Sequence, residues 1–425
     1  MSQGRYYNSE LVNTVYVVNP QAIQTSGTTS TDAFGRLRVS NPFTLFDSAH
    51  RYSDNGHFVE STTAGGSSSF DSDEGLMNLT TTTASGASVL RETKRVFNYQ
   101  PGKSLLTILS FNFNEAKNNL RQRIGYFGTE NGFYLEQDGL TEVAFVKRSS
   151  VTGSTVDTKV SQSDWNVDQL DGTGPSKLTL DLTKVQILWF DFEWLGAGTV
   201  RCGFIIDGAY ILCHSFHHAN VIQGTYITTA TLPVRVEITN TDTTSSNSTL
   251  KQICATVLSE GGYQLQGDSG EAKLPVASPR DLTNVSTDYP VISIRLKSNR
   301  LDGVVILDSL NVLGITNNAN YCWELVQGAS TTGGTWVSAG TSSLVEYNIT
   351  ATGYSQGDGE ILTAGYAVGS NQGSDTVELQ RDNLFAYQLE RNTFTSTPFE
   401  LVLIASTDSA GSDILASLGW QETTR

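Results

Sequence analysis

The ten residues Val185-Gln-Ile-Leu-Trp-Phe-Asp-Phe-Glu-Trp194 alternate large apolar side chains with polar ones. One row of side chains, spaced two residues apart, consists of Leu188, Phe190, Phe192 and Trp194. The other row holds Asp191 and Glu193 together with Trp189. A period of two residues is that of a β-strand, whose successive side chains point to opposite faces of a sheet. The stretch therefore predicts a half-buried strand, with one face in the core of an antiparallel sandwich and the other toward solvent.

Similar runs lie on both sides of this strand along the chain. Between residues 85 and 265, short β-prone runs alternate with turns that contain glycine, and clear examples are Ser104–Phe113 and Val234–Thr239. A second set of such runs begins at Pro290 and ends with Phe399–Ala405. Short strands at regular spacing are typical of jelly-roll-like β-sandwiches. The expected fold class is all-β, with antiparallel β-sandwich domains.

The distribution of these runs divides the chain into four parts. Residues 1–40 are predicted to form an extended N-terminal arm, because the polar run 24–31 follows a single short β-prone run. Residues 41–265 are predicted to form a large β-sandwich domain and residues 290–425 a second one. The segment 266–289 lacks periodicity and contains two prolines, so it is predicted to be an interdomain linker.

The amino-acid composition of the chain argues against some classes of binding partner. The chain has 425 residues, with 27 basic and 43 acidic ones and a formal net charge of −16. An acidic surface repels phosphate, so nucleic acid is not an expected partner. The sequence contains no 18-residue apolar run, so no membrane span is expected. Its N-terminus has no apolar segment typical of a secretory signal, which indicates synthesis in a cytoplasm.

Two of the four cysteines flank a predicted hairpin turn. Asp207-Gly208 is typical of a type I′ turn, and stepping outward from it places Cys202 opposite Cys213. Directly opposite residues of this kind lie about 5.5 Å apart at Cα, within the range that a disulfide spans. A Cys202–Cys213 disulfide is therefore one candidate. Two buried thiols are the favoured alternative, because a cytoplasm keeps thiols reduced.

Three of the five histidines lie close together in the segment 213–218. On a strand, His214 and His218 share a face and His217 points away, so His214 and His218 are the candidate metal ligands. A zinc site needs three or four convergent ligands. The favoured alternative is a packed or hydrogen-bonded histidine cluster at the end of a strand.

Catalytic motifs are incomplete in this sequence. Gly267-Asp-Ser-Gly270 matches the residues around the nucleophile of trypsin-like serine proteases, but Glu271-Ala272 replaces the usual Gly-Pro continuation. A plain turn is the favoured interpretation. No pair of carboxylates can be assigned to adjacent strands, as glycoside hydrolysis would require. We therefore expect no catalytic residues, no cofactor and no enzymatic activity.

Several blocks of residues together carry a resemblance to a known group of proteins. They are Asp32–Ser40, Pro42–Ser48, His50–Tyr52, Glu92–Phe97, Tyr99–Ser104, Leu120–Phe127, Asp171–Pro175, Glu193–Gly196, Cys213–Asn220 and Ser259–Tyr263. This combination resembles uncharacterised virion structural proteins of tailed phages, notably phages of marine and cyanobacterial hosts. The resemblance covers residues 32–263, and it brings no catalytic residues with it.

The resemblance implies a structural protein of the virion that is made in the host cytoplasm. Its implied partners are other virion proteins and copies of itself, with a homotrimer expected by analogy. A tail- or baseplate-associated adaptor or fibre-attachment component is the main hypothesis. One alternative is a capsid decoration or head-fibre protein. Another is a carbohydrate-binding receptor module for a host surface glycan, which would need exposed aromatic residues in the loops of 315–375.

Overall fold

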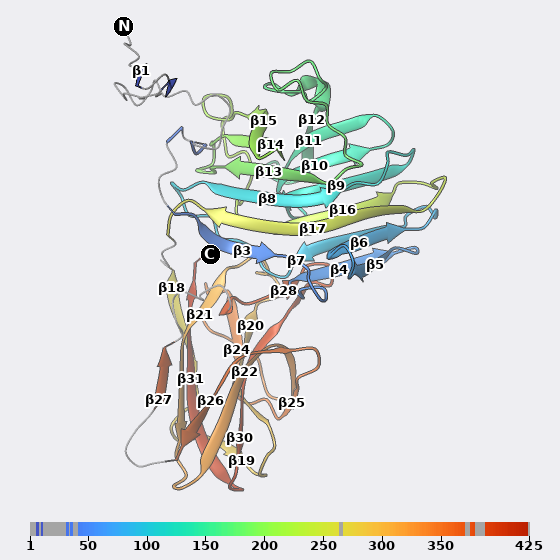
Figure 1. The fold of residues 1–425 in the computed structure, drawn as a ribbon. Coiled ribbons are helices and arrows are strands. Elements are labelled where there is room, and N and C mark those ends of the chain that lie inside the picture. Colours follow the sequence, from blue (N-terminus) through green and yellow to red (C-terminus); the bar gives the residue numbers. More distant parts are fainter. Residues whose placement is uncertain are drawn as a thin grey trace.

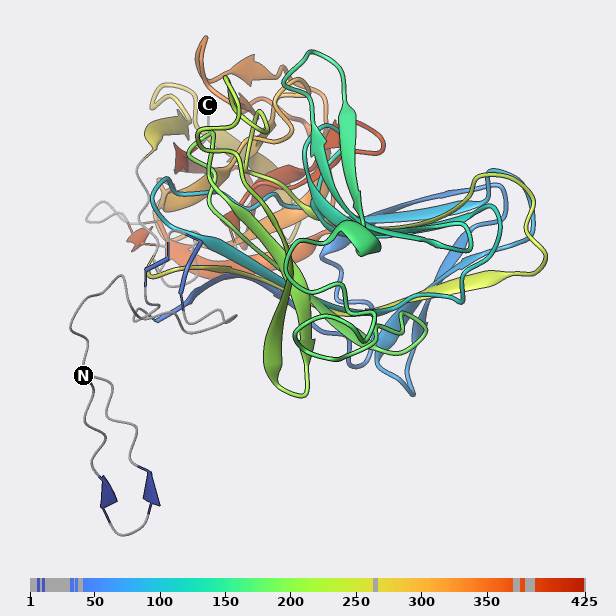
Figure 2. The ribbon, with the colours of Figure 1, turned by 90° about the horizontal axis from the view of Figure 1, so that it is seen from above.

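The computed structural model describes residues 6–7, 10–11, 31–33, 35–36, 41–262, 267–369, 375–378 and 387–423. Its strands form two antiparallel β-sandwiches, one above the other in Figure 1. The strands of the first sandwich run across that view, and those of the second run down it. Seen from above, the first sandwich extends well beyond the second on one side (Figure 2). The all-β fold class with antiparallel sandwiches is thus confirmed.

The first sandwich consists of two facing sheets. One sheet contains, in spatial order, β12 (Val156–Ser161), β11 (Glu142–Ser149), β10 (Gly132–Asp138), β9 (Leu120–Phe127), β16 (Val234–Asn240), β7 (Ser88–Thr93) and β4 (Phe58–Thr63). The other contains β15 (Ala209–Phe216), β14 (Val200–Ile206), β13 (Gln186–Phe192), β8 (Leu105–Asn112), β17 (Ser248–Ser259), β6 (Leu76–Thr81) and β5 (Ser67–Asp71), with β3 (Phe43–Ser48) paired to β17. A short 3-10 helix, η2 (Gln162–Asp164), follows β12.

Strand β13 shows how the core of this sandwich is built. Its side chains at Leu188, Phe190 and Phe192 are fully buried between the sheets, as the alternation predicted. Beyond the exposed Ile187, the opposite face is buried too, which differs from the expected half-buried strand. There Trp189 covers Gly203, whose missing side chain leaves room for the indole, since a Cβ atom would lie 2.9 Å from the ring. Asp191 is also buried on that face.

The hairpin between β14 and β15 forms at the predicted turn. Asp207 and Gly208 have φ angles of 52° and 75°, the left-handed conformation that a type I′ turn requires. The register farther from the turn differs from the prediction, because a β-bulge at Cys202 and Gly203 shifts it by one residue. Cys202 therefore pairs with His214, and both Cys202 and Cys213 are buried free thiols. Burial raises the pKa of both thiols.

The second sandwich also consists of two facing sheets. One contains β18 (Asp268–Lys273), β31 (Ser412–Glu422), β21 (Val305–Gly314) and β27 (Asp375–Glu378), with β19 (Arg280–Leu282) also paired to β31. The other contains β23 (Val337–Ser338), β24 (Val345–Asn348), β20 (Tyr289–Leu296), β30 (Glu400–Thr407), β22 (Asn320–Thr332) and β25 (Gly353–Ser355), with β26 (Glu360–Val368) also paired to β22. A separate pair joins β28 (Arg391–Asn392) to β29 (Thr397–Pro398).

The segment predicted to be a linker, 266–289, contains two strands and the first residue of a third. Its residues form β18 and β19, which both pair with β31, and the beginning of β20. The motif Gly267–Gly270 therefore leads into a strand rather than forming a turn. Gly270 lies against the indole of Trp420, where a Cβ atom would come within 2.4 Å of the ring nitrogen. The small side chains that hide the strand pattern here make room for that tryptophan.

The predicted N-terminal arm, residues 1–40, lies mostly outside the described residues. Within it, β1 (Tyr6–Tyr7) pairs with β2 (Glu10–Leu11). Nearer the first sandwich, Nη2 of Arg201 donates a hydrogen bond to the carbonyl oxygen of Thr31 at 2.6 Å. Nη2 of Arg36 donates one to the carbonyl oxygen of Gly102 at 3.0 Å. The described end of this segment is therefore attached to the first sandwich.

Candidate functional site

The two sandwiches meet at a buried group of charges around Glu92 of β7, whose side chain is 1% exposed. Oε1 of Glu92 accepts hydrogen bonds from Nη2 of Arg391, at 2.9 Å, and from the Thr393 hydroxyl, at 2.7 Å. Oε2 accepts one from Nη1 of Arg235 at 3.2 Å. Arg235 belongs to the first sandwich and Arg391 to the second, so one carboxylate joins arginines of both. Because this carboxylate is buried, its negative charge is stable only while these partners neutralise it.

Further contacts close to this group also connect the two sandwiches, and together with the Glu92 group they form what we call the interdomain joint. Nε2 of Gln388 donates a hydrogen bond to the carbonyl oxygen of Val96 at 2.8 Å. The Val96 side chain packs with Val304 and Ile306 in a small apolar cluster. Apolar burial and buried ion pairs therefore act together to hold the two sandwiches in one relative position.

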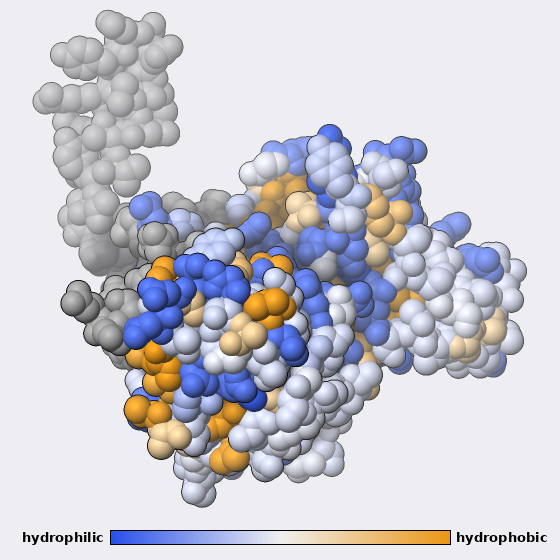
Figure 3. All heavy atoms as spheres, turned by 90° about the horizontal axis from the view of Figure 1, so that it is seen from below, coloured by the Kyte–Doolittle hydropathy of each residue, from blue (hydrophilic) through white to orange (hydrophobic). Residues whose placement is uncertain are grey.

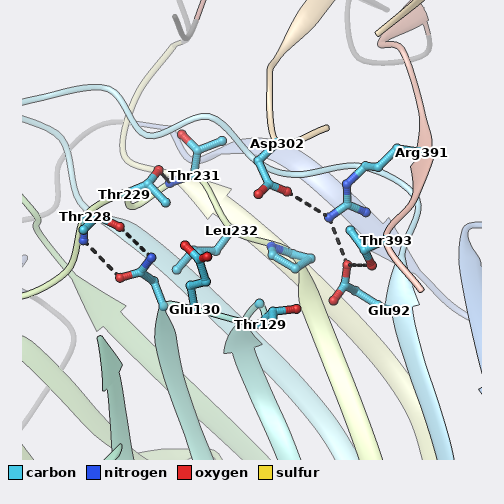
Figure 4. Close-up of a pocket in the computed structure, with 13 residues that line it drawn as sticks. Glu92, Thr129, Glu130, Thr228, Thr229, Thr231, Leu232, Asp302, Arg391 and Thr393 are labelled. Carbon is cyan, nitrogen blue, oxygen red and sulfur yellow. Dashed lines mark hydrogen bonds and ion pairs between the residues drawn. The ribbon is translucent and has the colours of Figure 1, made fainter. Parts of the chain in front are cut away.

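A pocket opens beside the joint, with a cavity volume of about 180 Å³. Loops of the first sandwich form one side of it, and residues of the second sandwich form the other (Figure 4). The lining residues are Glu92, Gly128, Thr129, Glu130, Asn131, Thr228, Thr229, Thr231, Leu232, Pro233, Asp302, Arg391 and Thr393. Most of these side chains carry a hydroxyl, amide or carboxylate group.

Asn131 fixes one wall of the pocket. Its side chain is buried, and its Oδ1 accepts a hydrogen bond from the backbone N–H of Thr228 at 3.0 Å. Its Nδ2 donates one to the Thr228 hydroxyl at 2.7 Å. Farther along the same loop, the backbone N–H of Thr231 donates to the Thr229 hydroxyl at 3.1 Å. These bonds hold the hydroxyls of Thr228 and Thr229 in place, and the neighbouring Leu232 adds apolar surface.

The charged side chains of the pocket differ in whether groups of the protein bond to them. Nη1 of Arg391 donates to the carbonyl oxygen of Thr93 at 2.5 Å, while its Nη2 bonds to Glu92. Asp302 lies 3.6 Å from the same Nη2, but its side chain is 69% exposed (Figure 4). Glu130 is exposed as well. The guanidinium is thus occupied by protein acceptors, whereas two carboxylates of the pocket face solvent.

A charged strip crosses the outer face of the sheet beside the pocket. Arg123 lies 2.6 Å from Glu136 and 3.4 Å from Glu237, measured between side-chain nitrogen and oxygen. Arg235 lies 2.6 Å from Glu237, and Lys159 lies 2.5 Å from Glu136. Glu136 and Glu237 are buried and each has two cationic partners. Carboxylates held in this way stabilise the sheet and are poorly placed to transfer protons.

The histidines proposed as metal ligands are bonded separately. Nδ1 of His218 lies 2.6 Å from the carbonyl oxygen of Gly198, and its Nε2 lies 3.0 Å from Nζ of Lys147. Nδ1 of His214 lies 3.3 Å from the backbone nitrogen of Asn166. Burial lowers the pKa of both histidines to about 4. Within the part of the chain that the structure describes, no three His, Cys, Asp or Glu side chains are grouped to hold a metal ion.

The aromatic residues expected to form a glycan site in 315–375 lie apart from the pocket. Trp323 is buried in the core of the second sandwich. Trp336 stacks beneath the guanidinium of Arg295, 3.9 Å from its carbon atom to the ring centre. Tyr366 is 79% exposed on β26. None of the described residues in that range lines the pocket, which is built from 92, 128–131, 228–229, 231–233 and three residues of the second sandwich.

Sequence reasoning missed the pocket residues. Glu92 and Arg391 are 299 positions apart, and neither belongs to a motif of known chemistry. The one available signal was the position of Glu92 within a β-prone run, where a charge on a buried strand needs a partner. Nothing in the sequence indicated that the partner would come from the other domain.

No protein-family model and no curated protein sequence matches the chain. Among solved structures, a β-glucanase of Bacillus licheniformis is similar at 12% identity, over 52% of this chain and 98% of that chain, with a TM-score of 0.33. The lectin UEA-II complexed with galactose matches at 10% identity, over 51% of this chain and 98% of that chain, with a TM-score of 0.31. A legume lectin-like domain from Entamoeba histolytica matches at 10% identity, over 53% of this chain and 100% of that chain, with a TM-score of 0.30. At these scores the likeness carries no conclusion about activity or ligand.

Among the described residues, no helix has the length and the apolar character that are needed to cross a membrane.

Proposed function

We propose that the chain is a non-enzymatic saccharide-binding protein and that the pocket at the interdomain joint is its ligand site. The observation that carries this proposal is a cavity of about 180 Å³ lined mainly by hydroxyl, amide and carboxylate groups. A sugar presents many hydroxyl groups, each of which both donates and accepts hydrogen bonds. Sites built to bond such groups discriminate strongly against ligands that lack them.

The pocket is organised before any ligand arrives. Asn131 holds Thr228 through two hydrogen bonds, and Glu92 holds Arg391 and Thr393 on the opposite side. A site whose groups are already fixed loses little conformational entropy when a ligand binds. Apolar surface at Leu232 and Pro233 can contact the C–H groups of a sugar ring.

The same residues support binding without catalysis. Glycoside hydrolysis needs two carboxylates that flank the bond to be cleaved, one of them kept protonated by an apolar environment. Glu92 is bonded to two arginines, while Asp302 and Glu130 are open to solvent. None of these three environments suits a general acid.

The proposal is tested by saccharide binding to the full chain on a glycan array, followed by titration calorimetry of the bound glycans. Thr231→Val removes a pocket hydroxyl, and Thr107→Val is the matched control, a buried threonine of β8 outside the pocket. We expect the pocket variant to weaken binding by about tenfold, the effect of one lost hydrogen bond to a polar ligand, with the control unchanged. Absence of saccharide binding, or equal binding by both variants, would contradict the proposal.

We further propose that this protein serves on a tailed-phage particle, in the tail or baseplate in the first instance. The blocks of resemblance in residues 32–263 support this, and so does the surface of the second sandwich. Figure 3 shows hydrophobic areas among hydrophilic ones on its face. Elsewhere on this domain, Tyr366 and Val368 lie two residues apart on β26, with exposures of 79% and 60%. Adjacent exposed apolar side chains are typical of surfaces that contact other proteins.

Immunogold labelling of purified virions with an antibody to residues 290–425 tests this second proposal. Gold confined to the tail or its tip is the expected result. Gold over the whole head would identify a decoration or head-fibre protein instead. Unlabelled particles, with the protein also undetected in a blot of the virions, would overturn the particle assignment altogether.

A further inference from the structure

We infer that the interdomain pocket selects neutral and amino-bearing sugars and rejects sugars that carry a carboxylate, sulfate or phosphate group. The inference rests on the proposed saccharide-binding function and adds the chemical class of the ligand. It follows from how the hydrogen-bonding groups of the pocket are already used.

The cation of the pocket is already bonded to acceptors of the protein. Of the described residues that line it, Arg391 alone is cationic at neutral pH. Its Nη1 donates to the carbonyl oxygen of Thr93, and its Nη2 donates to Glu92. Its Nε is buried away from solvent and has no hydrogen-bond partner. An incoming anion would need the accessible fork of a guanidinium, and this one is turned to protein acceptors.

The three carboxylates of the pocket differ in whether a cation neutralises them. Glu92 is neutralised by Arg235 and Arg391, which reach its two oxygens from opposite sandwiches. Asp302 has only a 3.6 Å contact with Arg391, and its side chain is largely exposed. Glu130 is exposed on the other side of the pocket. A ligand therefore meets two solvated carboxylates, which accept hydrogen bonds and donate none.

The two solvated carboxylates distinguish ligands by their charge. A negative group placed in this pocket would approach Asp302 and Glu130 with no accessible cation to offset the repulsion. A sugar hydroxyl can donate to either carboxylate, and an ammonium group would form the stronger, charge-assisted bond. The order of affinity is therefore amino sugar, then neutral sugar, then acidic sugar.

Three probes that share one ring make the test direct: glucosamine, glucose and glucuronic acid. Binding of each to the full chain is followed by saturation-transfer NMR and titration calorimetry at neutral pH and low salt. We expect glucosamine to bind more tightly than glucose, and glucuronic acid to bind more weakly than glucose by about tenfold. Raising the salt concentration should reduce the preference for glucosamine, because exposed charges are screened.

Variants that remove one charge each test whether the two carboxylates cause the preference for glucosamine. Asp302→Asn and Glu130→Gln are each expected to weaken glucosamine binding more than glucose binding and to strengthen glucuronic acid binding. Glu271→Gln is the matched control, because that carboxylate is 64% exposed and lies on β18, away from the pocket. Thermal unfolding of each variant verifies that the fold is intact.

The outcomes separate this inference from the function on which it rests. If glucuronic acid binds as tightly as glucose, the selectivity is overturned while saccharide binding stands. If the variants leave all three affinities unchanged, Asp302 and Glu130 do not set the selectivity and the inference fails. If none of the three sugars and no glycan of the array binds, the proposed function itself fails.

Discussion

Oε1 of Glu92 lies 2.9 Å from Nη2 of Arg391, although 299 positions separate the two residues in the chain. The pair is buried, and it joins the first sandwich to the second. Arg235 approaches the other oxygen of the same carboxylate, so removing that one charge leaves two arginines without their shared partner. The stability of the joint and the shape of the pocket therefore depend on the same side chain.

Glu92→Gln should lower the free energy of unfolding by roughly 3 kcal/mol, because the buried Arg391 loses its nearest counter-charge, while Arg235 keeps Glu237. Chemical denaturation followed by tryptophan fluorescence measures the change. Glu271→Gln, which removes an exposed partner of Lys273, should change the free energy by no more than about 0.5 kcal/mol. An equal effect of the two substitutions would show that the joint does not depend on the Glu92 charge.

Asn131→Ala should weaken saccharide binding although Asn131 need not contact the sugar. The substitution removes the bonds that hold Thr228, so that hydroxyl loses its fixed position. We expect a loss of unfolding free energy of about 1–2 kcal/mol as well, since buried bonds are broken. Calorimetric titration and denaturation measure the two effects. Unchanged affinity in a destabilised variant would remove Asn131 and Thr228 from the binding site.

Acid should destabilise the first sandwich between pH 6.5 and about 4. In the folded protein, burial lowers the pKa of His214 and His218 to about 4, whereas the unfolded chain has the ordinary value of 6.5. Below pH 6.5 the unfolded state binds protons that the folded state does not, so stability present above pH 6.5 is lost as the pH falls. Thermal unfolding across this range measures the loss.

The double variant His214→Gln, His218→Gln separates this effect from the titration of carboxylates. Its stability should fall less steeply between pH 6.5 and 4 than that of the unchanged chain. A decline of the same slope in both proteins would show that other groups cause the acid sensitivity.

The four thiols should react at different rates with a thiol-specific reagent such as Ellman's reagent. Cys254 is exposed and should react first in the native protein, and the partly buried Cys322 should follow. Cys202 and Cys213 should react only after denaturation, because both are buried and burial raises the pKa of each thiol. Two thiols instead of four in the denatured, unreduced protein would instead indicate a disulfide.

Local patterns predicted the elements whose structure depends on their own residues. The alternation at 185–194 predicted β13, and Asp207-Gly208 predicted a hairpin whose turn forms as expected. The burial of Trp189 on the second face of β13 was not predictable, because it depends on Gly203 of the next strand making room for the indole. The strand β18 was missed for a similar reason, since its small residues complement Trp420, more than a hundred positions later.

The residues of the candidate site could not be predicted from the sequence. Glu92, Asp302 and Arg391 come from distant parts of the chain, and no spacing connects them. Their proximity is a consequence of how one sandwich docks on the other. That docking depends on contacts such as Val96 with Ile306, which look like ordinary core residues in the sequence.

Strand β31 has a consequence for how the protein is made. It is the last of the described strands to be synthesised, yet β18, β19 and β21 all pair with it. The first sandwich uses strands between Phe43 and Ser259, so it can fold while the ribosome is still translating the rest. The second sandwich must wait until residue 422 has emerged. A messenger RNA truncated before β31 would yield a folded first sandwich followed by strands whose edges are unpaired. Such edges pair with other chains, so this product should aggregate or be bound by chaperones.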